Sequence, residues 1–341
     1  MIKPSTKVYR EQIIEGFSIP AVIHNGSYFF VDIDVYSDGR VECWNFEDFE
    51  HFKKDVKRGW VVLSIPDNEE ISISELGWWK IKEASWLFTK ESFINYVSGL
   101  VKELNPKLNN LYSYSQKVVN GIRIGDSGKG TPYKEKKTAD HDPFPEKIRG
   151  DSTNLFYKDN EIYYLVKVIV FSDSTVTLSR LEEPVQLSLE EFEKLTAEGI
   201  IVTSIPFGSI VHIHGLGSFT VAEGEDDSDP IDIKDTLLQI KDILSELRGE
   251  PSTVDICRKA YKNYLDNPTA DNKEKLRDSY ESIPEHHKIY VGDMDIKDIQ
   301  VRMILYGKQE IESWTHYRVA QARGEKLPSI NIPGAEEDTI Q

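Results

Sequence analysis

The sequence predicts an α+β fold, with two similar modules in tandem followed by a small helical domain. Residues 28–41 resemble residues 163–176 at an offset of 135, and residues 59–66 resemble residues 199–206 at an offset of 140. Beyond residue 252 the apolar residues recur at helical spacing instead. Repeats of this kind determine the architecture of a chain, so we expect each module to follow the order β-β-β-α-β-β-β-α.

In the first module, residues 1–106, turn signals and apolar periodicity place the elements. Asn25-Gly26 separates two strands and is a strong hairpin signal. A helix over 46–57 has Phe49, Phe52 and Val56 on one face and ends at Gly59. The predicted strands cover 21–24, 27–36, 40–44, 60–65, 70–74 and 78–83, and a second helix covers 90–104.

The second module, residues 151–251, repeats this order. The predicted strands cover 155–157, 162–171, 175–179, 200–204, 210–213 and 218–221, and the helices cover 189–197 and 231–247. Residues 107–150 hold several glycines and an excess of Lys and Arg over Asp and Glu. This composition predicts a flexible or loosely packed basic linker between the modules.

The third region, residues 252–326, is predicted to be a helical domain. Its helices are expected over 254–265, 272–282, 295–306 and 310–323. The polar tail, residues 327–341, has no periodicity and predicts disorder or an extended arm.

Comparing the two modules position by position predicts which side chains are buried. Trp79 and Ile81 correspond to the apolar Phe219 and Val221, so this side of the strand is expected to face the core. The side chains of Trp78, Lys80 and Lys82 then point to the opposite side, which predicts a solvent-facing surface. The same alternation places Trp44 on the outside, where the second module has Ser179.

The tryptophans are unevenly distributed, because five of the six lie in the first module. On a solvent-facing surface, tryptophans are typical anchors of a binding interface. We therefore expect a binding site at Trp44 and Trp78 with Lys80 and Lys82. The alternative is that the other module, the linker or the helical domain covers this face.

Charge and composition limit the partners. The formal net charge is −17, which disfavours nucleic acid and anionic membranes and permits a basic protein partner. No run approaches the roughly 18 apolar residues of a membrane helix. Cys43 and Cys257 are the only cysteines and form no motif, which favours a cytoplasmic setting.

Two histidine-containing segments are candidates for metal chemistry. His212 and His214 share one face of a predicted strand, but their counterparts are the serines at 72 and 74, which is typical of a solvent face. His286, Asp293 and Asp295 could bind a hard cation for hydrolysis. The alternative for the second segment is helix capping, by Asp295 at the start of a helix and Asp298 in its first turn.

The sequence therefore favours a non-enzymatic, acidic interaction protein that binds a protein partner, of the kind exemplified by bacterial immunity and antitoxin proteins. One alternative is a metal-dependent hydrolase or nuclease with its site at His286, Asp293 and Asp295. Another is a scaffold subunit whose modules form an internal pseudo-dimer. No motif predicts a cofactor, and the sequence does not specify an oligomeric state.

Overall fold

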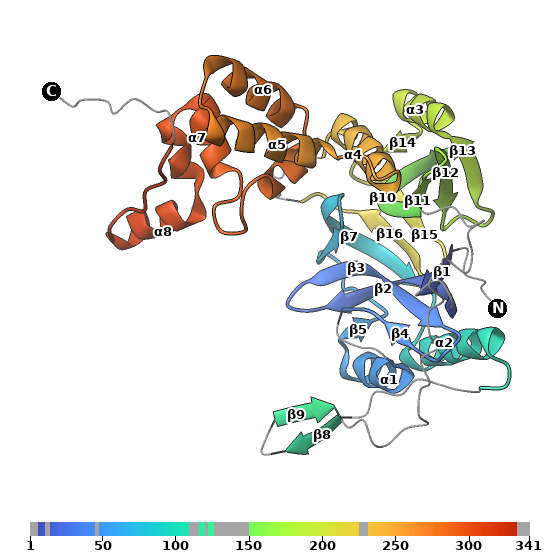
Figure 1. The fold of residues 1–341 in the computed structure, drawn as a ribbon. Helices are drawn as coiled ribbons and strands as arrows, with labels where there is room; N and C mark the ends of the chain where they lie inside the picture. Colours follow the sequence, from blue (N-terminus) through green and yellow to red (C-terminus); the bar gives the residue numbers. More distant parts are fainter. Residues whose placement is uncertain are drawn as a thin grey trace. The chain divides into compact units, whose positions relative to one another are not determined.

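The computed structural model describes residues 15–44, 48–108, 150–224 and 231–332 with their side chains, and the backbone of a few further strand residues. They belong to two compact units, Met1–Ile231 and Asp232–Gln341. The first unit contains two α+β modules and the second is helical, so the predicted fold class is confirmed (Figure 1).

The first module has more strands than the sequence predicted. Its elements are β1 (Thr6–Arg10), β2 (Ile14–His24), β3 (Tyr28–Tyr36), β4 (Val41–Glu42), α1 (Phe49–Arg58), β5 (Val61–Val62), β6 (Glu70–Ile73), β7 (Gly77–Trp86) and α2 (Lys90–Leu104). Helix α1 begins at Asp48, whose side chain accepts a hydrogen bond from the His51 N–H, and ends at Gly59 in the left-handed region. Helix α2 begins with a capping box of Thr89 and Ser92.

The second module repeats this order from the strand equivalent to β2, with one additional hairpin strand, β13 (Val185–Ser188), but without a final helix. Its elements are β10 (Gly150–Asp159), β11 (Ile162–Phe171), β12 (Thr175–Ser179), β13, α3 (Leu189–Ala197), β14 (Ile201–Val202), β15 (Ile210–Ile213) and β16 (Gly217–Val221). The helix predicted over 231–247 as its last element forms, but it belongs to the compact unit that begins at Asp232. The linker prediction is partly wrong, because β8 (Gln116–Val119) and β9 (Ile122–Gly125) pair as a two-stranded sheet and Gly150 already belongs to β10. The rest of the linker lies outside the described residues.

Both modules contribute to one sheet, with the order β1-β2-β3-β6-β7-β16-β15-β11-β10-β14 and with β4, β5, β12 and β13 attached beside this path. Its pairs are antiparallel except β3 with β6 and β11 with β15, which are parallel. The modules join where β7 pairs with β16 (Figure 1). There Ile81 lies opposite Val221, its own counterpart in the repeat. The duplicated strands therefore meet about an approximate two-fold axis, an isologous contact within one chain.

The outer face of the first module's sheet carries its helices. Phe52 and Val56 of α1 and Phe93 and Val97 of α2 are buried together with the apolar side chains of β2 and β3. On the opposite face, Phe30 is buried under the guanidinium of Arg180 from the second module, 4.8 Å from its ring. The inner faces of the two modules therefore pack against each other.

A buried ion-pair network connects these inner faces. Arg180 donates to both carboxylate oxygens of Asp32 at 2.6 and 2.8 Å and also to Asn154 Oδ1 at 2.7 Å. Lys167 Nζ lies 3.0 Å from Asp32 Oδ2. Burial alone would raise the pKa of Asp32, but the attraction of Arg180 and Lys167 outweighs it and holds that pKa below its ordinary value. Asp32 and Lys167 occupy equivalent repeat positions, so the two modules are complementary in charge about the axis.

Asp34, on the same strand face, lies in a less favourable environment. Burial raises its pKa more than the neighbouring Ser18 hydroxyl and Lys167 lower it, and its Oδ1 has no hydrogen bond of good geometry among the described residues. Oδ2 accepts a long bond of 3.4 Å from Tyr36 Oη. A buried carboxylate with so few close partners destabilises the folded state when it is ionised.

Replacing Asp34 with asparagine is therefore expected to raise the free energy of unfolding at pH 7 by about 1 kcal/mol. The folded-state pKa lies above the unfolded one, so the penalty is present at neutral pH and is relieved as the pH falls through the folded pKa. Urea unfolding at pH 7 and near pH 4 measures this, and the gain should shrink at the lower pH. The exposed Asp159→Asn is the control, and an equal gain at both pH values would contradict the account.

The helical unit contains more short helices than the sequence predicted. Its elements are α4 (Ile233–Leu247), α5 (Thr253–Asp266), α6 (Ala270–Glu281), the 3₁₀ helices η1 (Glu285–Tyr290) and η2 (Lys308–Ser313), α7 (Ile299–Tyr306) and α8 (Thr315–Arg323). The helix expected to begin at Asp295 begins at Ile299, because Lys297 has a positive φ of 55°. The core joins Cys257, Leu276 and Ile304. No helix in the described part of the chain is long and apolar enough to cross a membrane.

The start of the polar tail packs on this unit. Asn331 accepts a hydrogen bond of 2.8 Å from the side chain of Gln300, and Ile332 contacts the helical core. Of the two predicted alternatives, disorder or an extended arm, disorder is therefore wrong at these two residues. Residues 333–341 lie outside the described part of the chain.

Candidate functional site

Two exposed tryptophans flank one phenylalanine on the first module. The ring centroid of Phe29 in β3 lies 5.3 Å from that of Trp44 and 5.8 Å from that of Trp78 in β7. Trp44 is 62% exposed and Trp78 is 40% exposed. We call Phe29, Trp44 and Trp78 the aromatic patch. The exposed positions predicted for the two tryptophans are confirmed, and the structure brings them together through Phe29, which the sequence did not indicate.

Strand register explains how residues so far apart in the sequence meet. Phe29 lies opposite Ser72 across β3 and β6, and Ser72 lies opposite Trp78 across β6 and β7. The three side chains therefore occupy one row on one face of the sheet. Trp44 lies two residues beyond Glu42, the last residue of β4 that pairs with β3, and occupies a turn.

The second module has no such patch. At the positions equivalent to Phe29, Ser72 and Trp78 it has Tyr164, His212 and Ser218, and the rings of Tyr164 and His212 meet edge to face at 5.5 Å. The expectation that Ser179 faces solvent is wrong, because it is only 1% exposed. Strand β12 continues its pairing through Ser179, and the hydroxyl donates to the Lys167 carbonyl at 3.0 Å.

Lys80 and Lys82 share the outward side of β7 with Trp78, as predicted from the strand period. Both are half-buried rather than fully exposed. Lys80 lies opposite Glu70 on β6, and Lys82 lies opposite Thr220 on β16. The two lysines therefore extend from the aromatic patch toward the junction of the modules.

A groove of about 450 Å³ adjoins the patch at Trp78. Trp78, Trp79 and Lys80 line one wall, and Ile205 and Phe207 of the second module line another. The remaining lining residues are Glu70, Leu76, Gly77, Ser204, Val221, Ala222, Gly224 and Ile231. A groove of this volume with a mostly apolar lining is typical of sites that bind a ligand or a partner's side chain.

Phe207 lines this groove but was not among the binding residues predicted from the sequence. It is 65% exposed and follows the Ile-Pro pair that occurs at the same position in both modules. In the first module the same position is Asp67. The replacement of an acidic turn residue by an exposed phenylalanine was the available signal.

The histidines of the second module form no metal site in the described residues. Burial, and then repulsion from His214, lower the pKa of His212, which favours its neutral form. No group of three His, Cys, Asp or Glu side chains that could hold a metal is found in the part of the chain that the structure describes.

The alternative hydrolytic site in the helical unit is not assembled either. His286 lies 3.3 Å from Gln239 Oε1, while Asp293 accepts backbone N–H bonds from Asp295 and Ile296 at 3.0 and 2.7 Å. The predicted helix cap at Asp295 is not formed, because the helix begins later, at Ile299, and Asp293 instead caps the preceding turn. The carboxylate of Asp298 accepts a 2.5 Å bond from Tyr280 Oη instead of capping its own helix.

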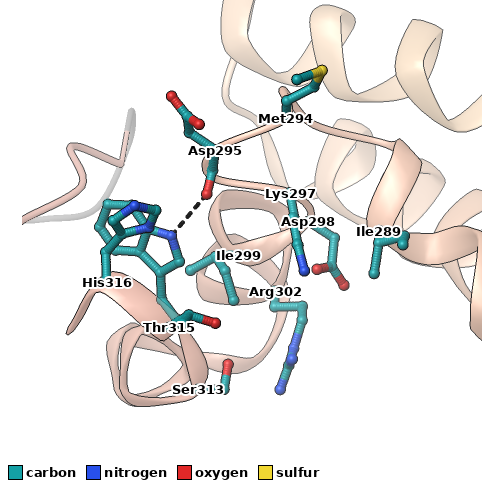
Figure 2. A pocket seen from close by; sticks show the side chains of 11 residues that line it. Ile289, Met294, Asp295, Lys297, Asp298, Ile299, Arg302, Ser313, Thr315 and His316 are labelled. Atoms are coloured by element: carbon teal, nitrogen blue, oxygen red, sulfur yellow. Dashed lines mark hydrogen bonds between the residues drawn. The ribbon is translucent and has the colours of Figure 1, made fainter. Parts of the chain in front are cut away.

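Asp295 lines a separate pocket of about 240 Å³ in the helical unit (Figure 2). Its carbonyl accepts a 2.9 Å hydrogen bond from Trp314 Nε1. Lys297 and Arg302 line the same pocket together with Asp298, so two positive charges offset its two carboxylates. His286 and Asp293 are not part of this lining.

Comparisons with known proteins support the duplication. A family model described as a domain of unknown function, DUF7638, matches residues 4–108 and 138–251. A second model, described as the domain of unknown function DUF7639, matches residues 252–329. No curated protein and no solved structure gives a match. The matched segments reproduce the division into two modules and a helical domain.

Proposed function

The chain belongs to the family of domains of unknown function DUF7638, and from the surface of its first module we propose that it is a non-enzymatic interaction protein that binds a basic protein partner. The observation that supports this most is the aromatic patch, where Trp44 and Trp78 stay exposed on either side of Phe29. Exposed tryptophans that cluster are typical centres of protein interfaces.

The energetics favour a partner at this surface. Covering a large exposed aromatic side chain with a partner favours the complex in free energy. A rigid indole also loses little conformational entropy on binding. Phe29 is half-buried against the core of the first module, so both tryptophans contact a side chain that is itself fixed by packing. Within the described residues, neither the other module nor any other segment covers them fully.

Charge supports a basic partner. The formal net charge of −17 would speed association with a positively charged protein and would repel nucleic acid. The specific form of the proposal is an immunity- or antitoxin-like protein that blocks a basic effector in the cytoplasm. The two cysteines of this chain are free, as expected in a reducing compartment.

The enzymatic alternative receives less support, because the Asp293 carboxylate accepts backbone hydrogen bonds of a turn and Asp295 lines a pocket that includes neither His286 nor Asp293. The scaffold alternative is favoured by one observation, the pairing of Ile81 with its counterpart Val221, which forms the internal two-fold that such a subunit would use. It remains a second proposal and is compatible with partner binding at the aromatic patch.

Replacing both Trp44 and Trp78 with alanine is expected to weaken binding of the partner by at least about 100-fold, because each buried tryptophan anchor contributes roughly 2 kcal/mol or more. The partner would first be isolated by affinity capture on the wild-type chain and then titrated calorimetrically. The matched control is Tyr164→Ala, at the position of the second module that is equivalent to Phe29. Unchanged affinity in the double variant would show that the patch is not the interface.

A further inference from the structure

Three aromatic residues line the groove beside the patch. They are Trp78, Trp79 and Phe207, and two of them are well exposed, Trp78 at 40% and Phe207 at 65%. Trp79 is fixed from behind, with its ring 5.1 Å from Phe156 and its Nε1 donating to the Leu76 carbonyl at 3.0 Å. The groove is therefore lined by aromatic residues, of which Trp79 is held in place by its own contacts.

Elsewhere the chain pairs aromatic rings with its own cations. Arg180 lies 4.8 Å from the Phe30 centroid and Lys288 lies 5.1 Å from that of Tyr280. Among the described residues, no lysine or arginine is placed in this way over Trp78, Trp79 or Phe207. The exposed rings of Trp78 and Phe207 can therefore receive a cation from a partner.

The charges around the groove favour such a cation. Glu70 lines the groove and is exposed, and Glu223 lies between two residues that line it. Asp67 and Glu69 are exposed just before Glu70, whereas Lys80 is the one cation among the described residues that line the groove. Carboxylates therefore outnumber cations at this rim, and the local field attracts a positive group.

We propose that this groove receives an arginine side chain of the basic protein partner. The inference rests on the proposed protein-binding function and specifies what the partner presents. A guanidinium is planar, stacks on aromatic faces and forms charge-assisted hydrogen bonds with carboxylates, so it matches both the rings and Glu70. The volume of about 450 Å³ leaves room for one such side chain beside its backbone.

A pair of short peptides tests this on the full chain. The probe is acetyl-Gly-Arg-Gly-amide, and its matched control contains citrulline, a neutral side chain of nearly the same shape. Binding is followed through the tryptophan indole resonances in an NMR titration at low salt. The arginine peptide is expected to shift the Trp78 and Trp79 signals and to bind about 5- to 10-fold more tightly than the citrulline peptide.

Two variants locate the effect within the groove. Phe207→Ser removes an exposed ring and Glu70→Gln removes a charge, and each should weaken the arginine peptide at least about threefold with the rest of the spectrum unchanged. A third, Asp159→Asn, removes an exposed carboxylate outside the groove and the patch and should leave peptide binding intact. Equal affinity for both peptides, or full arginine selectivity in Phe207→Ser and Glu70→Gln, would overturn the proposal.

The outcome is separable from that of the proposed function. If the peptides bind without charge selectivity while Trp44→Ala still weakens the partner, the interaction surface stands and the arginine site is wrong. If the peptides show arginine selectivity but the partner binds the patch variants normally, the proposed interface is wrong and the groove remains a cation site.

Discussion

Replacing Asp32 with alanine is expected to lower the free energy of unfolding of the duplicated unit by about 3 kcal/mol. The change leaves Arg180, only 4% exposed at its side chain, and Lys167 without the carboxylate that neutralises them between the modules. Arg180 keeps its bond to Asn154 and its contact with Phe30, so the loss falls at the lower end of that typical for breaking a buried ion pair. Urea unfolding followed by tryptophan fluorescence measures it, since all tryptophans except Trp314 lie in the first module.

The matched control is Asp159→Ala, an exposed carboxylate on β10 that should change stability by less than about 0.5 kcal/mol. The pH dependence gives a second check. The folded-state pKa of Asp32 lies below its unfolded value, so its contribution is present above the unfolded pKa and is lost as the pH falls through the folded pKa. The difference between wild type and variant should therefore shrink below about pH 4. A difference that stays constant down to strongly acidic pH would mean that Asp32 acts by packing instead of charge.

Replacing Gly217 with alanine is expected to destabilise the same unit by roughly 3 kcal/mol. Gly217 has a φ of 152°, and a Cβ at this position would lie 2.3 Å from the Ser85 carbonyl oxygen on β7. The backbone of the neighbouring module would have to move, because that oxygen belongs to the strand that joins the modules.

Gly77 provides the control for this position, because it is the counterpart of Gly217 in the repeat. It also has a positive φ, of 80°, but a Cβ on Gly77 would have no neighbouring atom within 4 Å. Gly77→Ala should therefore cost only the left-handed strain, about 1 kcal/mol. Thermal unfolding of the two variants compares them directly, and equal losses would contradict a close junction of β7 with β16.

The repeat explains which parts of the fold could be predicted. Ile81 and its counterpart Val221 are both apolar, so the two modules predicted the same buried face of this strand. Both side chains are buried in the structure. The edge pairing of β7 with β16 had no comparable signal, because backbone hydrogen bonds are formed by any sequence. Asp32 and Lys167 read as ordinary polar surface, and only the packing of the two modules makes them partners.

For the candidate site, the exposure of the tryptophans could be predicted from the sequence, but the contacts between its residues could not. Strand alternation placed Trp44 and Trp78 outside, and both are exposed. Their contact through Phe29 depends on pairing between β3, β6 and β7, which a local pattern does not specify. Phe207 enters the groove from the other module, so it could be found only once the junction was known.

Site-specific photocrosslinking tests the proposed interface most directly. A photoreactive phenylalanine analogue would replace Trp44 in the aromatic patch and, as a control, Ile256 in the helical unit, which is 49% exposed. On irradiation in the presence of the partner, position 44 should form a covalent adduct with it and position 256 should not. A partner adduct at position 256 with none at position 44 would contradict binding through the first module.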